Sequence, residues 1–210
     1  MSELVLPMVV RIERDAPPTR TDALEAAARA VLLMLTQPAP EWRAAVAAWD
    51  GQRIRKVVRR ARGADWRRAL TVPGVDAPWH TAELRVYPPV PVDAWPPELI
   101  RLQVGGTNLD DPSPPAAPEA GTPLVLLAPD VELSTGKAMA QAAHAAQLGW
   151  RTLSRRLRRR WIDADFRIAV RDATSAQWRD EVAAGRPVVH DGGFTEVAPG
   201  TATALFTVAR

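Results

Sequence analysis

The chain has 210 residues, of which 47% are hydrophobic, and its 27 basic and 24 acidic side chains give a formal net charge of +3. This apolar content is enough for a packed core and excludes an intrinsically disordered protein. The absence of cysteine excludes a disulfide scaffold, a cysteine nucleophile and thiolate metal sites.

Three scattered histidines, His80, His144 and His190, argue against a histidine-rich metal site, and we expect no metal and no cofactor. The N-terminal residues lack the pattern of a secretory signal. No apolar run approaches the roughly 18 residues that a membrane helix needs. We therefore expect a cytoplasmic protein with no membrane partner.

In the N-terminal half, residues 4–13 predict a strand and residues 21–35 a helix. The segment 53–68 that follows is strongly basic, with Asp65 as its only acid. Its basic residues are Arg53, Arg55, Lys56, Arg59, Arg60, Arg62, Arg67 and Arg68.

A second basic segment, 151–160, contains arginines and no acid: Arg151, Arg155, Arg156, Arg158, Arg159 and Arg160. Such clusters attract phosphate groups through charge and counterion release. A solvated arginine-rich surface explains either segment alone. Two such segments in one chain favour a nucleic-acid partner.

Residues 110–123 mark the clearest boundary, because five of these fourteen residues are proline and no apolar periodicity crosses them. They predict a stiff, extended linker. A second proline-rich stretch, residues 86–97, predicts a loop around an edge strand. We place the linker at 107–123, between an N-terminal half at 1–106 and a C-terminal domain at 124–210.

Beyond the linker, the sequence predicts the order β-α-α-β-α-β-β. Ser134 is the expected N-cap of the first helix, and Gly149 and Gly185 are expected to end two of the helices. The expected elements are strand 123–130, helix 134–148, basic helix 151–160, strand 166–172, helix 175–185, and strands 186–192 and 201–209.

The two halves share a sequence pattern. Residues 49–67 align without a gap to residues 161–179, with eight identities in nineteen positions, two of them tryptophan. The identical pairs are Trp49/Trp161, Arg55/Arg167, Val58/Val170, Arg59/Arg171, Ala61/Ala173, Ala64/Ala176, Trp66/Trp178 and Arg67/Arg179. We interpret this as an internal duplication that packs as a pseudo-dimer within one monomeric chain. The repeated tryptophans are expected in the core or at the interface.

Lys137, Gln141 and His144 share one face of a predicted helix, because their spacing is i, i+4 and i+7. The alanines between them allow the helix to lie close to a neighbouring element, so the row is expected to edge a cleft. The start of the helix favours an anion, and Lys137 in its first turn indicates an anionic partner. An exposed lysine and a core histidine are the simpler alternative.

Asp191 follows a predicted strand and is followed by two glycines, Thr195 and the turn Pro199–Gly200. Polar groups on turns at strand ends are where α/β folds build sites. A turn-rich hairpin without chemistry is the alternative interpretation.

Together the two stretches resemble the type-2 peptidyl-tRNA hydrolases. Residues 136–145 match the family pattern Gly-Lys-x-x-x-Gln-x-x-His-Ala, and residues 191–203 match Asp-x-Gly-x-Thr-x-x-x-Pro-Gly-x-x-Thr. The resemblance covers residues 122–210 and implies a small mixed sheet with helices on both faces, usually as a dimer. The implied reaction is hydrolysis of the ester that joins a peptide to the 3′ end of tRNA. The expected fold class is therefore α/β, with two tandem three-layer halves of this kind.

By this resemblance, Lys137, Asp191 and Thr195 are the catalytic candidates, and Gln141, His144 and Thr203 are substrate-binding candidates. The arginine-rich segment adds Arg155 and Arg156, which are expected to bind the acceptor stem without sequence specificity. The family has a further lysine at the position where this chain has Thr135. The N-terminal half lacks both motifs and is expected to be an inactive partner.

Ester hydrolysis needs an oriented water and a stabilised oxyanion. An ionised Asp191 can orient water, and Lys137 and Thr195 can stabilise the oxyanion. The chain has no cysteine and no Gly-x-Ser-x-Gly motif, which argues against a covalent intermediate. We therefore expect a carboxylic ester hydrolase that acts on peptidyl-tRNA in translation. Two alternatives stay open: a catalytically silent tRNA-binding or RNA-binding protein, and a hydrolase or transferase that acts on another acyl-tRNA.

Overall fold

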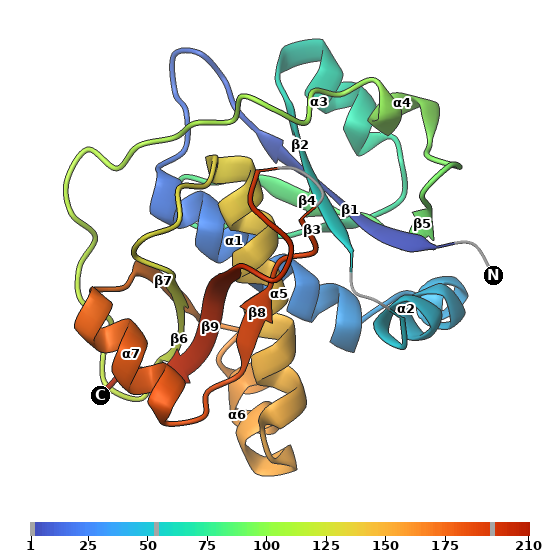
Figure 1. Ribbon diagram of the computed structural model, residues 1–210. Helices are drawn as coiled ribbons and strands as arrows, with labels where there is room; N and C mark the ends of the chain where they lie inside the picture. The colour runs from blue at the N-terminus through green and yellow to red at the C-terminus, as the bar shows by residue number, and fades with distance from the viewer. Residues whose placement is uncertain (1–2, 53–54, 194–195) are drawn as a thin grey trace.

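The computed structural model describes residues 3–52, 55–193 and 196–210. Within these residues the chain is an α/β protein with two mixed sheets and seven α-helices (Figure 1). The strands are β1 (Leu4–Arg11), β2 (Lys56–Ala61), β3 (Val75–Asp76), β4 (Leu84–Val86), β5 (Val90–Pro91), β6 (Pro123–Leu127), β7 (Ala169–Asp172), β8 (Val188–His190) and β9 (Ala202–Val208). The helices are α1 (Arg20–Thr36), α2 (Arg43–Asp50), α3 (Gly63–Leu70), α4 (Pro97–Ile100), α5 (Thr135–Thr152), α6 (Arg155–Asp163) and α7 (Ser175–Ala183). Among the described residues, no helix has both the length and the apolar character that a membrane span requires.

The two sheets have the same strand order. The N-terminal sheet runs β2-β1-β4-β3, with β5 paired to the start of β1, and the C-terminal sheet runs β7-β6-β9-β8. In each sheet the first two strands of that order are parallel and the other neighbours are antiparallel. Val58 pairs with Met8, its aligned residue Val170 pairs with Val125, and both partners belong to the central core. The predicted order of elements in the C-terminal half is confirmed.

Each sheet is covered on both faces, because its central strand is apolar on both sides. In β1, Met8 enters the central core, whereas the next residue, Val9, joins an outer cluster with Trp66 of α3. Successive side chains of a strand point to opposite faces, so this alternation places one helical layer on each side. The strand β6 alternates in the same way, and its outer cluster includes Trp178 of α7.

The helices α1 and α5 pack against each other in the middle of the molecule, and each also contacts strands of both sheets (Figure 1). Both helices bury many alanines, which lets them approach each other and the sheets closely. One hydrophobic core includes residues from both halves of the chain. The two halves are therefore joined by a shared interior.

Gly149 does not end the helix that was predicted to stop there, because α5 continues to Thr152. A Cβ atom at Gly149 would overlap the ring of Phe206 on β9. The glycine is used for this close approach between helix and strand, and it makes no C-terminal cap.

The predicted basic helix 151–160 is also interrupted. Leu153 is extended, and the side chain of Ser154 caps the new helix α6 by accepting from the backbone N–H of Leu157. Gly185, by contrast, follows α7 with a φ of +72°, as expected for a residue that ends a helix.

One of the two tryptophan pairs of the sequence alignment, Trp49 and Trp161, makes the same contact in both halves. Nε1 of Trp49 donates to the carbonyl oxygen of Arg55 at 2.9 Å, and Nε1 of Trp161 donates to that of Arg167 at 2.8 Å. Both indoles are buried, so their expected place in the core is confirmed. The repeated sequence pattern corresponds to repeated local structure.

Residues 107–122 form neither helix nor strand, but they are anchored to both central helices. The N–H of Leu109 donates to Oγ1 of Thr135 at 2.9 Å, at the start of α5. The carboxylate of Asp111 accepts from the N–H and Oγ1 of Thr21, at 2.9 and 2.7 Å, at the start of α1. The linker therefore lies across the N-terminal ends of α1 and α5 (Figure 1).

Candidate active site

Asp191 directly follows β8, and its backbone is fixed on both sides. Its N–H donates to the carbonyl oxygen of Thr201 at 2.8 Å, and its own carbonyl oxygen accepts from Gly200 at 2.7 Å. The N–H of Gly193 donates to Oδ1 at 2.7 Å, so the side chain is held by the turn that follows it. The turn predicted from the two glycines thus positions a buried carboxylate.

The other oxygen of Asp191 is held by α5. Nζ of Lys137 lies 2.7 Å from Oδ2, and Nε2 of Gln141 donates to the same oxygen at 2.5 Å. Oγ1 of Thr203, on β9, donates to Oε1 of Gln141 at 2.8 Å and thereby fixes the orientation of the amide. Both sequence motifs therefore meet at one carboxylate.

The pKa of Asp191 follows from these contacts. Burial acts to raise the pKa, but the hydrogen bonds from Lys137 and from the backbone of Gly193 lower it more, and the pKa lies below its usual value. Asp191 is therefore ionised at neutral pH. Because a carboxylate with a lowered pKa is a weak base, orientation of a water molecule suits it better than full removal of a proton.

The N-terminal end of α5 already has an anionic partner. Glu196 accepts from the N–H of Ser134 at 2.8 Å and from its Oγ at 2.7 Å. Ser134 is the N-cap, as predicted, and its Oγ accepts from the N–H of Lys137. The anion expected at this helix start is thus a side chain of the protein itself.

A cavity of about 390 Å³ opens beside Asp191, between the two halves. Its volume lies within the range of small-molecule sites. The C-terminal half contributes α5 and the turn after β8, and the N-terminal half contributes Arg55, the start of β2, Glu3 and residues 104–105. The cavity's main polar lining residues are Lys137, Gln141, His144, His190, Asp191, Glu196, Glu3, Arg55 and Lys56.

His144 is half-buried midway along α5 and lines this cavity. Burial, together with the positive charges of Lys56 and Arg151, lowers the pKa of His144 to about 2. The imidazole is therefore neutral, with one nitrogen as a donor and one as an acceptor. It can bind a neutral polar group of a ligand but carries no charge for an anion.

A second polar cluster lies beyond His144 along α5 and joins the two halves. Nζ of Lys56 donates to Oε1 of Gln147 at 2.6 Å, and Nε2 of Gln147 donates to Oδ1 of Asp50 at 2.5 Å. Asp50 also accepts from Arg151 at 2.6 Å. The sequence placed Lys56 only within a basic segment, because its partners lie on other elements and no local spacing reveals them.

Several predicted residues lie away from the cavity. Thr203 is fully buried, so it supports Gln141 and does not line the cavity. Arg155 and Arg156 are exposed on α6, outside the cavity. Thr195 lies outside the residues that the structure describes.

Thr135, where the resembling family has a lysine, is buried and turned toward the linker. Its Oγ1 accepts from the N–H of Leu109, and the side chain does not line the cavity. Lys137 is therefore the lysine of this helix that reaches the carboxylate.

The charged and polar groups around Asp191 are suited to hydrolysis of a polar substrate. An ionised carboxylate beside an ammonium group can orient water and stabilise a developing negative charge, and the neutral imidazole of His144 can position a polar group nearby. A comparison of the chain with protein-family models finds no matching family. The functional argument therefore depends on this geometry and on the two sequence motifs.

Proposed function

We propose that the chain hydrolyses the ester bond of peptidyl-tRNA, or of another N-blocked aminoacyl-tRNA, to free tRNA and peptide. The observation that carries this proposal is the Asp191 carboxylate, held by Lys137 and Gln141 at the wall of a cavity. Gln141 and Asp191 are 50 residues apart in the sequence and belong to the two different motifs. Their meeting supports the resemblance to type-2 peptidyl-tRNA hydrolases.

In the proposed reaction a water molecule attacks the ester carbonyl, and the tRNA 3′ oxygen leaves with a proton. Asp191 orients the water, and Lys137 offsets the negative charge that develops on the carbonyl oxygen. Gln141, itself fixed by Thr203, keeps the carboxylate in one orientation. No covalent intermediate with the protein is required.

Within the proposal, the matching sheets and the matching tryptophan contacts support an internal duplication. The two halves then form a pseudo-dimer through α1 and α5. The C-terminal half carries the reacting groups, and the N-terminal half completes the cavity wall with Arg55 and Lys56.

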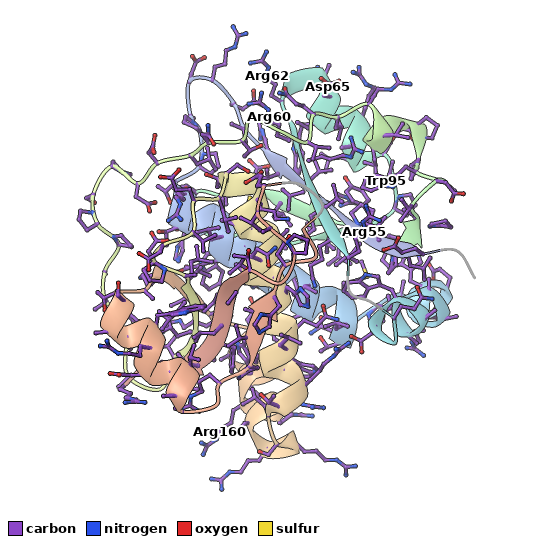
Figure 2. All side chains as sticks on the ribbon, in the orientation of Figure 1. Arg55, Arg60, Arg62, Asp65, Trp95 and Arg160 are labelled. Carbon is purple, nitrogen blue, oxygen red and sulfur yellow. The ribbon has the colours of Figure 1, made fainter. Side chains whose placement is uncertain are left out.

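The two basic segments approach each other at Lys56 and Arg151, which share the cluster of Gln147 and Asp50. Their outer arginines lie at opposite ends of the molecule. Figure 2 shows Arg160 of α6 at one end of the molecule and Arg60 and Arg62 at the opposite end. Arg59 is also used inside the fold, because its NH1 donates to the carbonyl oxygens of Ile100 and Leu102.

We therefore assign the contact with the tRNA acceptor stem to α6. Arg155 and Arg156 are exposed there and make no ion pair with a described carboxylate. Arginines on an exposed helix contact phosphates by charge, which suits recognition of an RNA duplex by its shape.

A catalytically silent RNA-binding protein is the second candidate, and one observation favours it. Position 135 is a threonine bonded to the linker, so α5 presents Lys137 to the cavity without a second lysine. A hydrolase or transferase for another acyl-tRNA is the third candidate and uses the same groups.

Release of N-acetyl-aminoacyl groups from labelled tRNA tests the proposal. Turnover by the wild type that collapses in Asp191→Asn supports it. Binding of tRNA without turnover supports the silent candidate, as does a large gain of activity from near zero in Thr135→Lys. Preference for a free aminoacyl-tRNA over a peptidyl-tRNA supports the third candidate.

A further inference from the structure

Lys56 is a cavity-lining residue that the proposed chemistry does not use. It is the first residue of β2, in the N-terminal half, and it lines the same cavity as Lys137 and Asp191. Its Nζ is held by Oε1 of Gln147 at 2.6 Å and lies 5.1 Å from the centre of the Trp49 ring. The amine is thus fixed in position by a neutral amide and an aromatic face.

Lys56 differs from the other basic residues of the cavity in having no carboxylate partner among the described residues. Arg55 pairs with Glu3 at 3.0 Å, and Lys137 pairs with Asp191 at 2.7 Å. The nearby acid Asp50 is instead bound by Gln147 and Arg151. A negative group that enters the cavity would supply the missing counter-charge.

The surroundings of Lys56 increase the influence that an entering anion would have on its protonation. Burial and the positive charge of Arg151 lower the pKa of Lys56 well below its usual value, and Asp50 opposes this only in part. His144, also on α5, is neutral and adds no counter-charge. An anion beside Nζ would favour the ammonium form, so its binding would be accompanied by proton uptake.

The position of Lys56 relative to Asp191 suits one ligand class. Gln141, which binds Asp191, and Gln147, which binds Lys56, are six residues apart on α5, roughly 9 Å along a helix axis. Lys56 and Asp191 are therefore bound at different levels of the same helix, so a ligand that contacts both must be extended.

We propose that Lys56 binds the phosphodiester next to the RNA 3′-terminal nucleoside while the acyl ester lies at Asp191. This inference rests on the proposed function, and it makes the cavity a composite site in which the N-terminal half recognises the nucleic-acid end of the substrate.

The test measures binding without hydrolysis. The probes are a short single-stranded RNA with the 3′-terminal sequence of tRNA and the same RNA with a neutral methylphosphonate at its last linkage. For the wild type, the neutral linkage should weaken binding about tenfold or more, the loss expected for one charge-assisted hydrogen bond. Lys56→Met should bind the normal RNA about as weakly, and the neutral linkage should then have no further effect.

Two variants control this cycle. Lys56→Arg keeps the positive charge and should retain most of the discrimination between the two RNAs. Arg179→Met removes an exposed charge on α7, outside the cavity, and should bind like the wild type. Thermal unfolding of Lys56→Met shows whether the variant is folded.

The inference is overturned if the neutral linkage costs the same affinity in the wild type and in Lys56→Met, or if the wild type binds neither RNA. Coupling between Lys56 and the phosphate without any acyl-tRNA hydrolysis would uphold the subsite and reject the proposed function. Hydrolysis of acyl-tRNA without this coupling would uphold the proposed function and reject the subsite at Lys56.

Discussion

Gly149 in the last turn of α5 faces the ring of Phe206 on β9 so closely that an added Cβ atom would overlap the ring. Both residues belong to the packed interface between the helix and the C-terminal sheet, and Phe206 is buried. Gly149→Ala should therefore destabilise the protein by about 1–3 kcal/mol, because overpacking outweighs the roughly 1 kcal/mol gained in helix propensity. Urea unfolding measures the change.

A double-mutant cycle distinguishes this contact from a general effect on the helix. Phe206→Leu removes the ring, so adding Gly149→Ala to that variant should cost much less than it costs the wild type. An equal cost in both backgrounds would contradict the close approach.

The sequence predicted the elements that depend on local pattern and missed features that depend on distant residues. The strands of the C-terminal half followed from apolar runs, and the N-cap Ser134 followed from its residue type. Gly149 was wrongly expected to end the helix, because nothing near it in the sequence shows that Phe206 packs there.

The part of the candidate site that depends on local spacing was predictable, and the part that depends on distant residues was not. Helical spacing placed Lys137, Gln141 and His144 on one face, and all three line the cavity. The interpretation missed Lys56 as a separate feature, because its partner Gln147 lies 91 residues away. Long-range pairing of this kind leaves no trace in local composition.

Glu25 on α1 should be important for the junction between the halves. It is buried and accepts from Arg171 of β7 at 2.7 Å and from Nε1 of Trp79 at 2.8 Å. Glu25→Ala leaves Nε1 of Trp79 without this acceptor and Arg171 without its carboxylate, so we expect a loss of about 3 kcal/mol or more in the free energy of unfolding.

Glu83→Ala is the matched control for Glu25→Ala. Glu83 forms a solvent-exposed ion pair with Arg11, so its removal should change the free energy of unfolding by less than about 1 kcal/mol. Chemical denaturation compares the two variants. A similar loss in the free energy of unfolding of both variants would contradict the role of Glu25 at the junction between the halves.

His144 should make the protein less stable at mildly acidic pH. Burial, aided by Lys56 and Arg151, lowers its pKa from 6.5 to about 2, so the folded protein takes up no proton there when the unfolded chain does. Stability should therefore fall with pH below about 6.5, by up to roughly 1.4 kcal/mol per pH unit from this group.

The comparison is the free energy of unfolding of the wild type and of His144→Gln between about pH 7 and pH 5, where histidine titrates. The wild type should lose more stability over this interval than the variant, because only its unfolded chain gains a proton at position 144. Parallel profiles would mean that His144 is protonated in the folded protein.

The exposed arginines of α6 should control RNA affinity independently of the cavity. Arg155→Glu combined with Arg156→Glu should weaken tRNA binding and reduce its dependence on salt, by about one unit of slope for each phosphate that the variant no longer neutralises. Both side chains are exposed, so the thermal stability should change little. Arg179→Glu on α7 reverses one exposed charge elsewhere and should leave tRNA affinity nearly as it is. Filter binding at several salt concentrations decides the matter, because an unchanged affinity and an unchanged slope in the α6 variant would remove α6 from the RNA interface.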